Sequence, residues 1–224
     1  MKFEIFEKLC SERFPFWDML KKEDQSYIYE NTYKKIYKKN TTIYDGSEEG
    51  GLIIVNNGCL RVYIISDDDK ELTLMRIHKD ELCILSASFI NEPITFDIFV
   101  DAEEDSDCYF ISGEAFEKIN NKYEQARIYA LENTVDCLSN IMWIMQQVLF
   151  MSMDKRLAIF LLDEISRTQT DTVMLTHSLI AKYMGSAREV VSRMLKYFEN
   201  EGIVELSRKG VKIVDKKRLR ELTL

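Results

Sequence analysis

The 224-residue chain has no apolar run that approaches the roughly 18 residues needed to span a membrane. Its longest apolar segments, such as residues 141–145, are interrupted by polar residues within a turn or two. The first eight residues include Glu4 and Glu7, where a secretory signal needs an uninterrupted apolar stretch. We therefore expect a cytoplasmic protein that does not associate with a membrane.

Clustered cysteines and histidines are also lacking. The five cysteines lie at least 24 positions apart and form no C-x-x-C pair, which suits neither a disulfide framework nor a zinc site. The two histidines, His78 and His177, belong to different segments, and no P-loop, G-x-S-x-G, H-E-x-x-H or Rossmann glycine pattern occurs. We expect reduced, mostly buried cysteines and predict no metal, no cofactor and no enzyme activity.

The net charge of -8 hides an asymmetry along the chain. From Asp154 to Leu224 there are 14 basic and 10 acidic side chains, whereas the preceding residues hold 16 basic and 28 acidic ones. Residues 176–220 alone carry 11 basic against 5 acidic side chains. Such a sign change indicates either a nucleic-acid partner for the C-terminal segment or a basic surface that faces only water.

The hydrophobic pattern divides the first half of the chain into two parts. Residues 3–31 have the spacing of short helices. From Lys34 to Ile111, short β-branched runs alternate with turn signals, which predicts an antiparallel barrel or sandwich. The runs are 42–44, 52–55, 60–65, 72–75, 94–100 and 108–111, and the turns are Asp45-Gly46, Gly50-Gly51, Asn56-Asn57-Gly58 and Asp67-Asp68-Asp69.

A long helix is predicted next, because no proline follows Pro93 and no glycine lies between Gly113 and Gly185. Two heptad-like stripes run along it, and we expect one to face a second copy of the chain and the other its own barrel. A single buried helix of a monomer is the alternative. We assign the dimer contact to the stripe Ala130, Thr134, Cys137, Ile141, Ile144, Val148 and Met151, which leaves Leu131, Val135, Leu138, Met142, Met145 and Leu149 for the barrel.

The C-terminal segment has the pattern of a winged helix-turn-helix. Thr176 is a predicted N-cap of a helix that ends at Gly185, and Ser186 with Glu189 forms a predicted capping box for the next helix. That second helix has an apolar face, which we assign to Ala187, Val191, Met194, Leu195 and Phe198. Two short strands, 203–206 and 211–214, flank the basic turn 207–210.

The polar face of the second helix carries Arg188, Glu189 and Arg193. A guanidinium group matches guanine O6 and N7, and a carboxylate accepts from cytosine N4, so this trio is suited to reading G·C pairs. The ordinary alternative is that Glu189 caps the helix and pairs with Arg193. We predict a DNA-binding set of Thr176, His177, Arg188, Glu189, Ser192, Arg193, Lys196, Arg208 and Lys209, in which Lys196, Arg208 and Lys209 contact phosphate.

These segments resemble the cAMP receptor protein/fumarate-nitrate regulator (Crp/Fnr) family of bacterial transcription factors. The resemblance covers about residues 30–220 and is strongest in residues 175–193 (LTHSLIAKYMGSAREVVSR), 39–46 (KNTTIYDG) and 55–62 (VNNGCLRV). It implies an α+β chain with a β-roll sensor at 1–113, a dimerisation helix at 114–152 and a winged helix-turn-helix at 153–224. It also implies that Arg188, Glu189 and Arg193 contact the bases of palindromic, TGTGA-like half-sites, and that RNA polymerase is a partner.

The sensor segment departs from the cyclic-nucleotide-binding members of that family. Nine carboxylates and no Lys or Arg lie between Asp80 and Phe110, so a bound phosphate would be an unpaired anion. We therefore expect an effector other than cyclic AMP, in a pocket that includes Cys83, Leu85, Ser86, Thr95 and Phe96. The cysteine cluster of the iron-sulfur members is absent, since that region holds only Cys10.

Two alternatives stay open at this point. Cys83 falls near the position of a haem ligand in a carbon-monoxide-sensing relative, with His78 five residues before it, so a haem cofactor is an alternative to a purely structural cysteine. A different class of function is a ligand- or redox-sensing dimer whose C-terminal module is mainly a protein interaction surface. The leading hypothesis is a homodimeric DNA-binding regulator.

Overall fold

The computed structural model describes residues 3–45, 51–84 and 98–224. The chain forms two compact units, which we describe separately. The first unit consists of Met1–Ile64 and Leu74–Ile141, and the second consists of Ile65–Thr73 and Met142–Leu224. No helix in the described ranges combines the length and hydropathy that a membrane span requires.

Two antiparallel four-stranded sheets form the β-roll of the first unit, which confirms the predicted sheet type. Strand β7 is Phe99–Ala102, and residues 94–97 of the predicted run lie outside the described ranges. Strands β1 and β6 had no clear sequence signal. The sheet orders are β1 (Thr32–Tyr37), β8 (Ser106–Ser112), β3 (Gly51–Asn57), β6 (Leu82–Ile84), and β2 (Thr42–Tyr44), β7 (Phe99–Ala102), β4 (Cys59–Ile65), β5 (Glu71–His78).

The turn between β3 and β4 is the predicted Asn56-Asn57-Gly58 turn. Gly58 has φ +97°, and a Cβ atom there would lie 2.3 Å from the Ser106 hydroxyl oxygen, so only glycine fits. The flanking runs provide the core between the two sheets, in which Val55, Leu60 and Val62 are buried. The turn therefore carries the chain from β3 in one sheet to β4 in the other, with both strands buried along most of their length.

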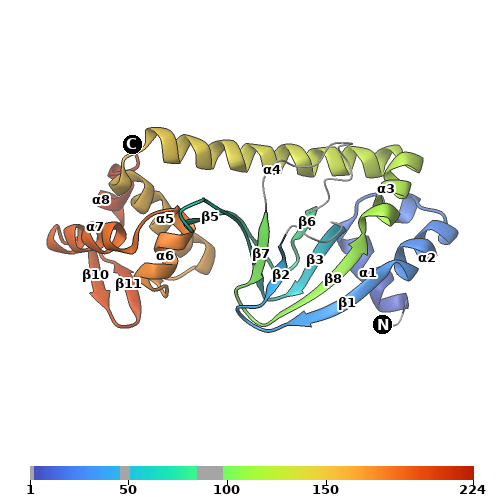
Figure 1. Cartoon of the computed structure of the whole chain (residues 1–224), viewed down its shortest axis with the longest axis horizontal. Helices are drawn as coiled ribbons and strands as arrows, with labels where there is room; N and C mark the ends of the chain where they lie inside the picture. The colour runs from blue at the N-terminus through green and yellow to red at the C-terminus, as the bar shows by residue number, and fades with distance from the viewer. Residues whose placement is uncertain (1–2, 46–50, 85–97) are drawn as a thin grey trace. The chain divides into compact units, whose positions relative to one another are not determined.

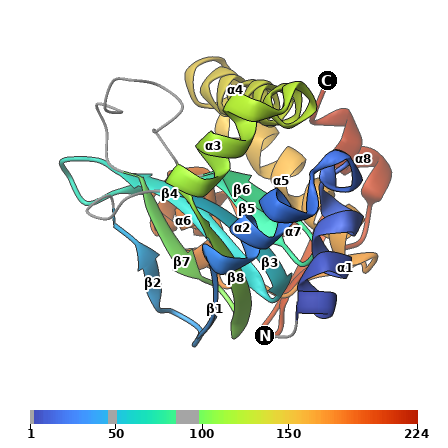
Figure 2. The same ribbon diagram turned by 90° about the vertical axis from the view of Figure 1, so that its right-hand side faces the viewer.

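Helices cover one end of the β-roll. Helix α1 (Phe3–Arg13) and helix α2 (Lys22–Glu30) lie near each other at the end that carries the N-terminus (Figures 1 and 2), with the short helix η1 (Trp17–Met19) between them in the chain. Their buried side chains meet helix α3 (Gly113–Lys122) in an aromatic cluster that includes Phe6, Phe14, Trp17 and Phe116. The predicted helices in residues 3–31 are confirmed.

The prediction of a single helix from residue 114 is wrong, because the helix is broken at Tyr123. Tyr123 has an extended backbone and separates α3 from the long helix α4 (Glu124–Phe150) (Figure 1). Its hydroxyl group donates to Asp24 Oδ2 at 2.6 Å and accepts from the Lys21 amide at 3.1 Å. Burial opposes ionisation of Asp24, but hydrogen bonds from Lys122 and Tyr123 outweigh it and lower the pKa of that carboxyl group.

The second unit has a core of its own, formed by Leu161, Ile180, Val191, Leu195 and Phe198 among others. The predicted helices and wing strands are present, and strand β9 and helix α8 are additional. The elements are α5 (Met153–Thr168), β9 (Thr172–Val173), α6 (His177–Met184), α7 (Arg188–Asn200), β10 (Val204–Ser207), β11 (Gly210–Ile213) and α8 (Lys216–Glu221), with sheet order β10-β11-β9.

Gly210→Ala should destabilise the second unit by about 2 kcal/mol or more, because φ is +141° and the new Cβ atom would lie 2.1 Å from the Val173 carbonyl oxygen. Gly202→Ala is the matched control, since φ is +70° but no atom lies within 4 Å of its Cβ position. Urea unfolding of the full chain measures both. Equal losses for the two variants would contradict a steric cause at Gly210.

Candidate nucleic-acid interface

Helix α6 begins and ends as predicted. The Thr176 hydroxyl oxygen accepts a hydrogen bond from the Leu179 amide at 3.2 Å, which satisfies one of the free amides of the first turn. Gly185 adopts a left-handed conformation with φ +60° and ends the helix. The capping residues therefore fix the short connection from α6 to α7.

The predicted capping box of α7 is wrong. Ala187 is the N-cap and no side chain caps the helix, so Glu189 has no capping role. The Ser186 amide instead donates to the Ala181 carbonyl oxygen at 3.0 Å, which assigns Ser186 to the end of α6. Ala187 is exposed and does not belong to the apolar face, unlike Val191, which is buried.

Three charged side chains on α7 are available to a ligand. Arg188, Glu189 and Arg193 are exposed, and within the described ranges they form no hydrogen bond or ion pair. The alternative in which Glu189 caps the helix and pairs with Arg193 therefore finds no support in this arrangement. Val191, Leu195 and Phe198 are fully buried on the other face and hold the helix in the core.

The structure brings together two other residues of the predicted DNA-binding set. His177, the first residue of α6, and Ser192, in the second turn of α7, are half-buried. The His177 Nδ1 atom lies 2.9 Å from the Ser192 hydroxyl oxygen, within hydrogen-bond distance. This bond links the first helix of the motif directly to the exposed face of the second.

Lys196 is exposed but already paired. Its Nζ atom lies 2.5 Å from Glu199 Oε2, and Glu199 also accepts a hydrogen bond from the Leu206 amide of the wing. These two donors lower the pKa of Glu199. A DNA phosphate that binds the Lys196 ammonium group must therefore compete with the Glu199 carboxylate.

The wing presents its charges at the turn between β10 and β11. The Ser207 hydroxyl group accepts from the Lys209 amide at 3.1 Å and donates to the Gly210 carbonyl at 3.2 Å, which shapes the turn. Arg208 and Lys209 are exposed there. Sequence reasoning omitted Tyr197, which is 50% exposed on α7, although its position one turn after Arg193 places it on the same face.

Helix α4 exposes the stripe that the sequence analysis assigned to the barrel. Within the predicted dimer stripe, Ala130 is only 6% exposed and packs in the aromatic core of the first unit, so it cannot contact a partner. Cys137, Ile141, Ile144 and Met151 are half-buried, whereas Thr134 and Val148 are exposed. The residues that are 45–64% exposed recur at alternating steps of three and four: Ile128, Leu131, Val135, Leu138, Met142, Met145 and Leu149.

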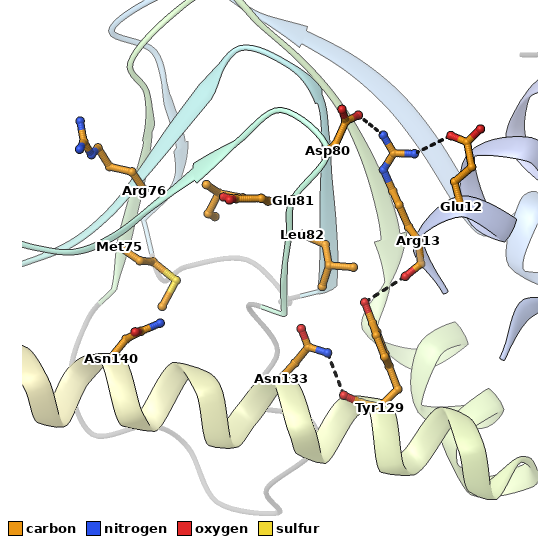
Figure 3. Close-up of a pocket in the computed structure, with 11 residues that line it drawn as sticks. Glu12, Arg13, Met75, Arg76, Asp80, Glu81, Leu82, Tyr129, Asn133 and Asn140 are labelled. Carbon is orange, nitrogen blue, oxygen red and sulfur yellow. Dashed lines mark hydrogen bonds and ion pairs between the residues drawn. The ribbon is translucent and has the colours of Figure 1, made fainter. Parts of the chain in front are cut away.

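Most of the predicted effector pocket lies outside the described residues, namely Leu85, Ser86, Thr95 and Phe96. Cys83 belongs to β6 and is opposite Ile53 in the sheet. Beside β6, the first unit contains an open cavity of about 540 Å³. Its lining residues are Glu12, Arg13, Met75, Arg76, Ile77, Asp80, Glu81, Leu82, Tyr129, Asn133 and Asn140. Figure 3 shows Met75 and Leu82 across the cavity from Asn140 and Asn133 of α4.

One guanidinium group of this cavity, that of Arg13, is already paired with carboxylates. The Arg13 side chain is 9% exposed and forms ion pairs with Asp80 and Glu12 (Figure 3). The Tyr129 hydroxyl group donates to the Arg13 carbonyl oxygen at 3.2 Å, which joins α1 to α4. A phosphate in the cavity would therefore have to compete with carboxylates for Arg13.

Four cysteines, Cys10, Cys59, Cys108 and Cys137, are free thiols. Cys10, Cys59 and Cys108 are buried, and Cys137 is half-buried. Burial raises the thiol pKa of Cys59 and of Cys108 to about 12, so both are protonated at neutral pH. Within the described ranges, no group of three or more His, Cys, Asp or Glu residues is placed to hold a metal ion.

A β-roll followed in the chain by a long helix and a winged helix-turn-helix defines a class, the DNA-binding transcription regulators with an N-terminal sensor. The model of the Crp-like helix-turn-helix domain matches residues 155–222, and that of the cyclic nucleotide-binding domain matches residues 34–123. The chain belongs to the Crp/Fnr family of transcriptional regulators, which are not enzymes.

Similar proteins support this assignment. A crystal structure of a Crp/Fnr-family regulator from Eubacterium rectale is 38% identical, with a TM-score of 0.86 over 95% of this chain and 99% of that one. The transcriptional regulator Flp of Lacticaseibacillus casei is 24% identical over 92% of this chain and 94% of its own length. FixK2 from Bradyrhizobium japonicum shares the fold, with 20% identity and a TM-score of 0.72 over 86% of this chain and 98% of its own.

Proposed function

We propose that the chain acts as a homodimer that binds specific palindromic DNA and responds to an effector other than cyclic AMP. The observation that carries this proposal is the exposed face of α7, where Arg188, Glu189 and Arg193 have no partner within the described ranges. Side chains with unpaired hydrogen-bond donors and acceptors on the second helix of this motif can form hydrogen bonds with base edges in the major groove. RNA polymerase is a further proposed partner.

Two half-sites about one helical turn apart, roughly 34 Å, follow from a symmetric dimer with one reading helix in each copy. We keep as the expected target the TGTGA-like half-site that the family resemblance implies, and two arginines and a glutamate suit its G·C pairs. Selection of bound duplexes from random DNA tests the proposal. It fails if no palindromic sequence is enriched over the starting pool.

The exposed stripe on α4 supports dimerisation. Its seven apolar residues follow the heptad spacing over about six turns of helix, which is the pattern of a two-helix seam. Such a continuous apolar surface is unusual on a monomer. We therefore place the proposed dimer contact at Ile128, Leu131, Val135, Leu138, Met142, Met145 and Leu149 rather than at the stripe with Ala130.

The cavity in the first unit is the proposed effector site. Its lining includes Leu82 of β6, next to the predicted pocket residue Cys83, but none of the five predicted pocket residues. Helix α4 lines one wall of it, so a ligand there would contact the helix that carries the dimer stripe. Its lining includes three carboxylates and two guanidinium groups, one of which, that of Arg13, is paired with Asp80. This composition supports a ligand other than a phosphodiester. We propose no resident cofactor and keep a haem near Cys83 as the alternative.

Cyclic AMP and cyclic GMP should not bind. The reason is the absence of Lys and Arg from Asp80 to Phe110 together with the engagement of Arg13 by carboxylates. Isothermal titration calorimetry of the full-length protein should give no saturable heat at micromolar nucleotide. Saturable binding that Arg13→Gln removes would show instead that Arg13 exchanges Asp80 for phosphate.

The alternative of a C-terminal protein interaction module makes a different prediction. A module of that kind would bind random duplex DNA weakly or not at all. A phosphate-contacting module releases counterions, so its DNA affinity falls steeply as salt rises. A gel shift over a series of salt concentrations distinguishes the two functions.

A further inference from the structure

The hydrogen bond between His177 and Ser192 couples a titratable ring to the DNA-facing surface of α7. The His177 Nδ1 atom and the Ser192 hydroxyl oxygen are 2.9 Å apart, and within the described ranges neither side chain has another partner. Ser192 directly precedes Arg193 and lies one helical turn after Arg188, both of which are exposed. Ser192 is therefore the hydroxyl group placed among the proposed base-reading residues.

The state of the imidazole ring decides which way the serine hydrogen points. When Nδ1 carries no hydrogen, it accepts the Ser192 O–H, and the hydroxyl oxygen keeps only lone pairs for another partner. When the ring is protonated, Nδ1–H donates to the hydroxyl oxygen, and the O–H is free to donate outward. Histidine is the side chain whose charge ordinarily changes between pH 5 and 8.

We propose that His177 sets the base preference of Ser192, so that the preference at one position of the half-site reverses with protonation. With neutral His177 in the tautomer that carries its hydrogen on Nε2, Ser192 donates to Nδ1 and accepts from a base donor such as cytosine N4 or adenine N6. With protonated His177, it donates to an acceptor such as guanine O6 or thymine O4. This inference rests on the proposed DNA-binding function and deepens it. His177 is a positioning residue that acts through Ser192.

The exposed charged residues Arg188, Glu189 and Arg193 lie on the same helix as Ser192. Within the described ranges none of them bonds to His177. The other charged groups on the elements packed against α6 are engaged with each other or with backbone, and none bonds to His177. These are Lys196 with Glu199, Arg167 with Glu164, Arg156 with the Met184 carbonyl, and Lys182 with Glu71. Asp154, Lys155 and Asp163 of α5 also form no bond to His177 in the described structure.

The test is selection from random duplexes by the full-length protein at pH 5.5 and pH 8 and at equal ionic strength. At one position in each half-site, the preferred base on the contacted strand should change from C or A at high pH to G or T at low pH. The change should be about tenfold in relative affinity, as expected for one direct hydrogen-bond contact. Competition binding with the two selected duplexes measures the ratio.

Two variants isolate the bond, and the other histidine is the matched control. His177→Gln cannot titrate, so it should bind DNA with the same base preference at both pH values. Ser192→Ala should lose the preference at that position alone, whereas Ser192→Thr, which keeps the hydroxyl group, should retain the pH-dependent change. His78→Gln alters the chain's only other histidine, on β5 of the first unit, and should leave the change intact.

Each failure has a separate meaning. Specific binding with the same preferred base at both pH values would overturn the inference and leave the DNA-binding function standing. A pH-dependent change that persists in His177→Gln or disappears in His78→Gln would also overturn it. The absence of any enriched sequence at either pH would instead overturn the proposed function. If His177→Gln does not fold, Ser192→Ala and Ser192→Thr alone decide the outcome.

Discussion

Leu138→Asp combined with Met142→Asp should make the protein monomeric at micromolar concentration. Both side chains are more than half exposed on α4, in the middle of the apolar stripe. In a symmetric dimer, each substitution places two carboxylates in the seam, and a buried, unpaired charge costs several kcal/mol. We therefore expect the dimer dissociation constant to rise by more than about 100-fold, measured by sedimentation equilibrium.

Ile141→Asp combined with Ile144→Asp is the matched comparison, because it adds the same charge to the neighbouring, half-buried stripe. This pair should weaken association less and should lower the stability of the folded chain more, since these side chains are already partly covered within their own protomer. The opposite result would be a monomeric Ile141→Asp, Ile144→Asp variant and a dimeric Leu138→Asp, Met142→Asp variant. It would place the dimer contact on the stripe that was predicted from the sequence.

Helical periodicity could not choose between these stripes. Both repeat at steps of three and four, so the sequence predicts two apolar faces without indicating what covers each one. Ala130 belongs to the inner face because α1, η1 and α3 bring an aromatic cluster against it, with Phe14 and Phe16 packed on Tyr129 of the same helix. That contact joins residues more than 100 positions apart in the chain and has no local signal.

The broken helix and the capping box were mispredicted for a related reason. The absence of glycine and proline permits a continuous helix through Tyr123, but hydrogen bonds to Asp24 and Lys21 hold that residue extended. Ser186 and Glu189 have the spacing of a capping box, but the end of α6 already uses the Ser186 amide. In both places a competing partner outweighs a correct local preference.

The exposed face of helix α7 was more predictable than the cavity of the first unit. Arg188, Glu189 and Arg193 share a face because they lie on one helix, and the burial of Val191, Leu195 and Phe198 follows from the same periodicity. The cavity, by contrast, depends on Arg13 meeting Asp80, a pair separated by 67 positions. The His177–Ser192 bond also needs the angle between two helices, which the spacing of the residues does not supply.

The second large effect concerns the exposed face of α7 that is proposed to read bases. Arg188→Ala combined with Arg193→Ala should remove most discrimination between the selected palindrome and random DNA. Each bidentate arginine contact with guanine contributes about 1–3 kcal/mol of specificity, and a dimer makes each contact twice. We therefore expect the ratio of specific to non-specific affinity to fall by at least about 100-fold, measured by competition binding at fixed salt. The fold should be intact, because both side chains are exposed and unpaired within the described ranges.

Lys209→Ala provides the contrast, because a phosphate contact in the wing carries no sequence information. It should weaken binding to all duplexes alike and reduce the salt dependence by about one unit for each wing that contacts DNA. Lys217→Ala, an exposed lysine on α8, removes the same charge and should leave the salt dependence unchanged. If the double arginine variant enriched the same motif as the unaltered protein, Arg188 and Arg193 would be surface charges, and base reading would have to come from other residues of α7.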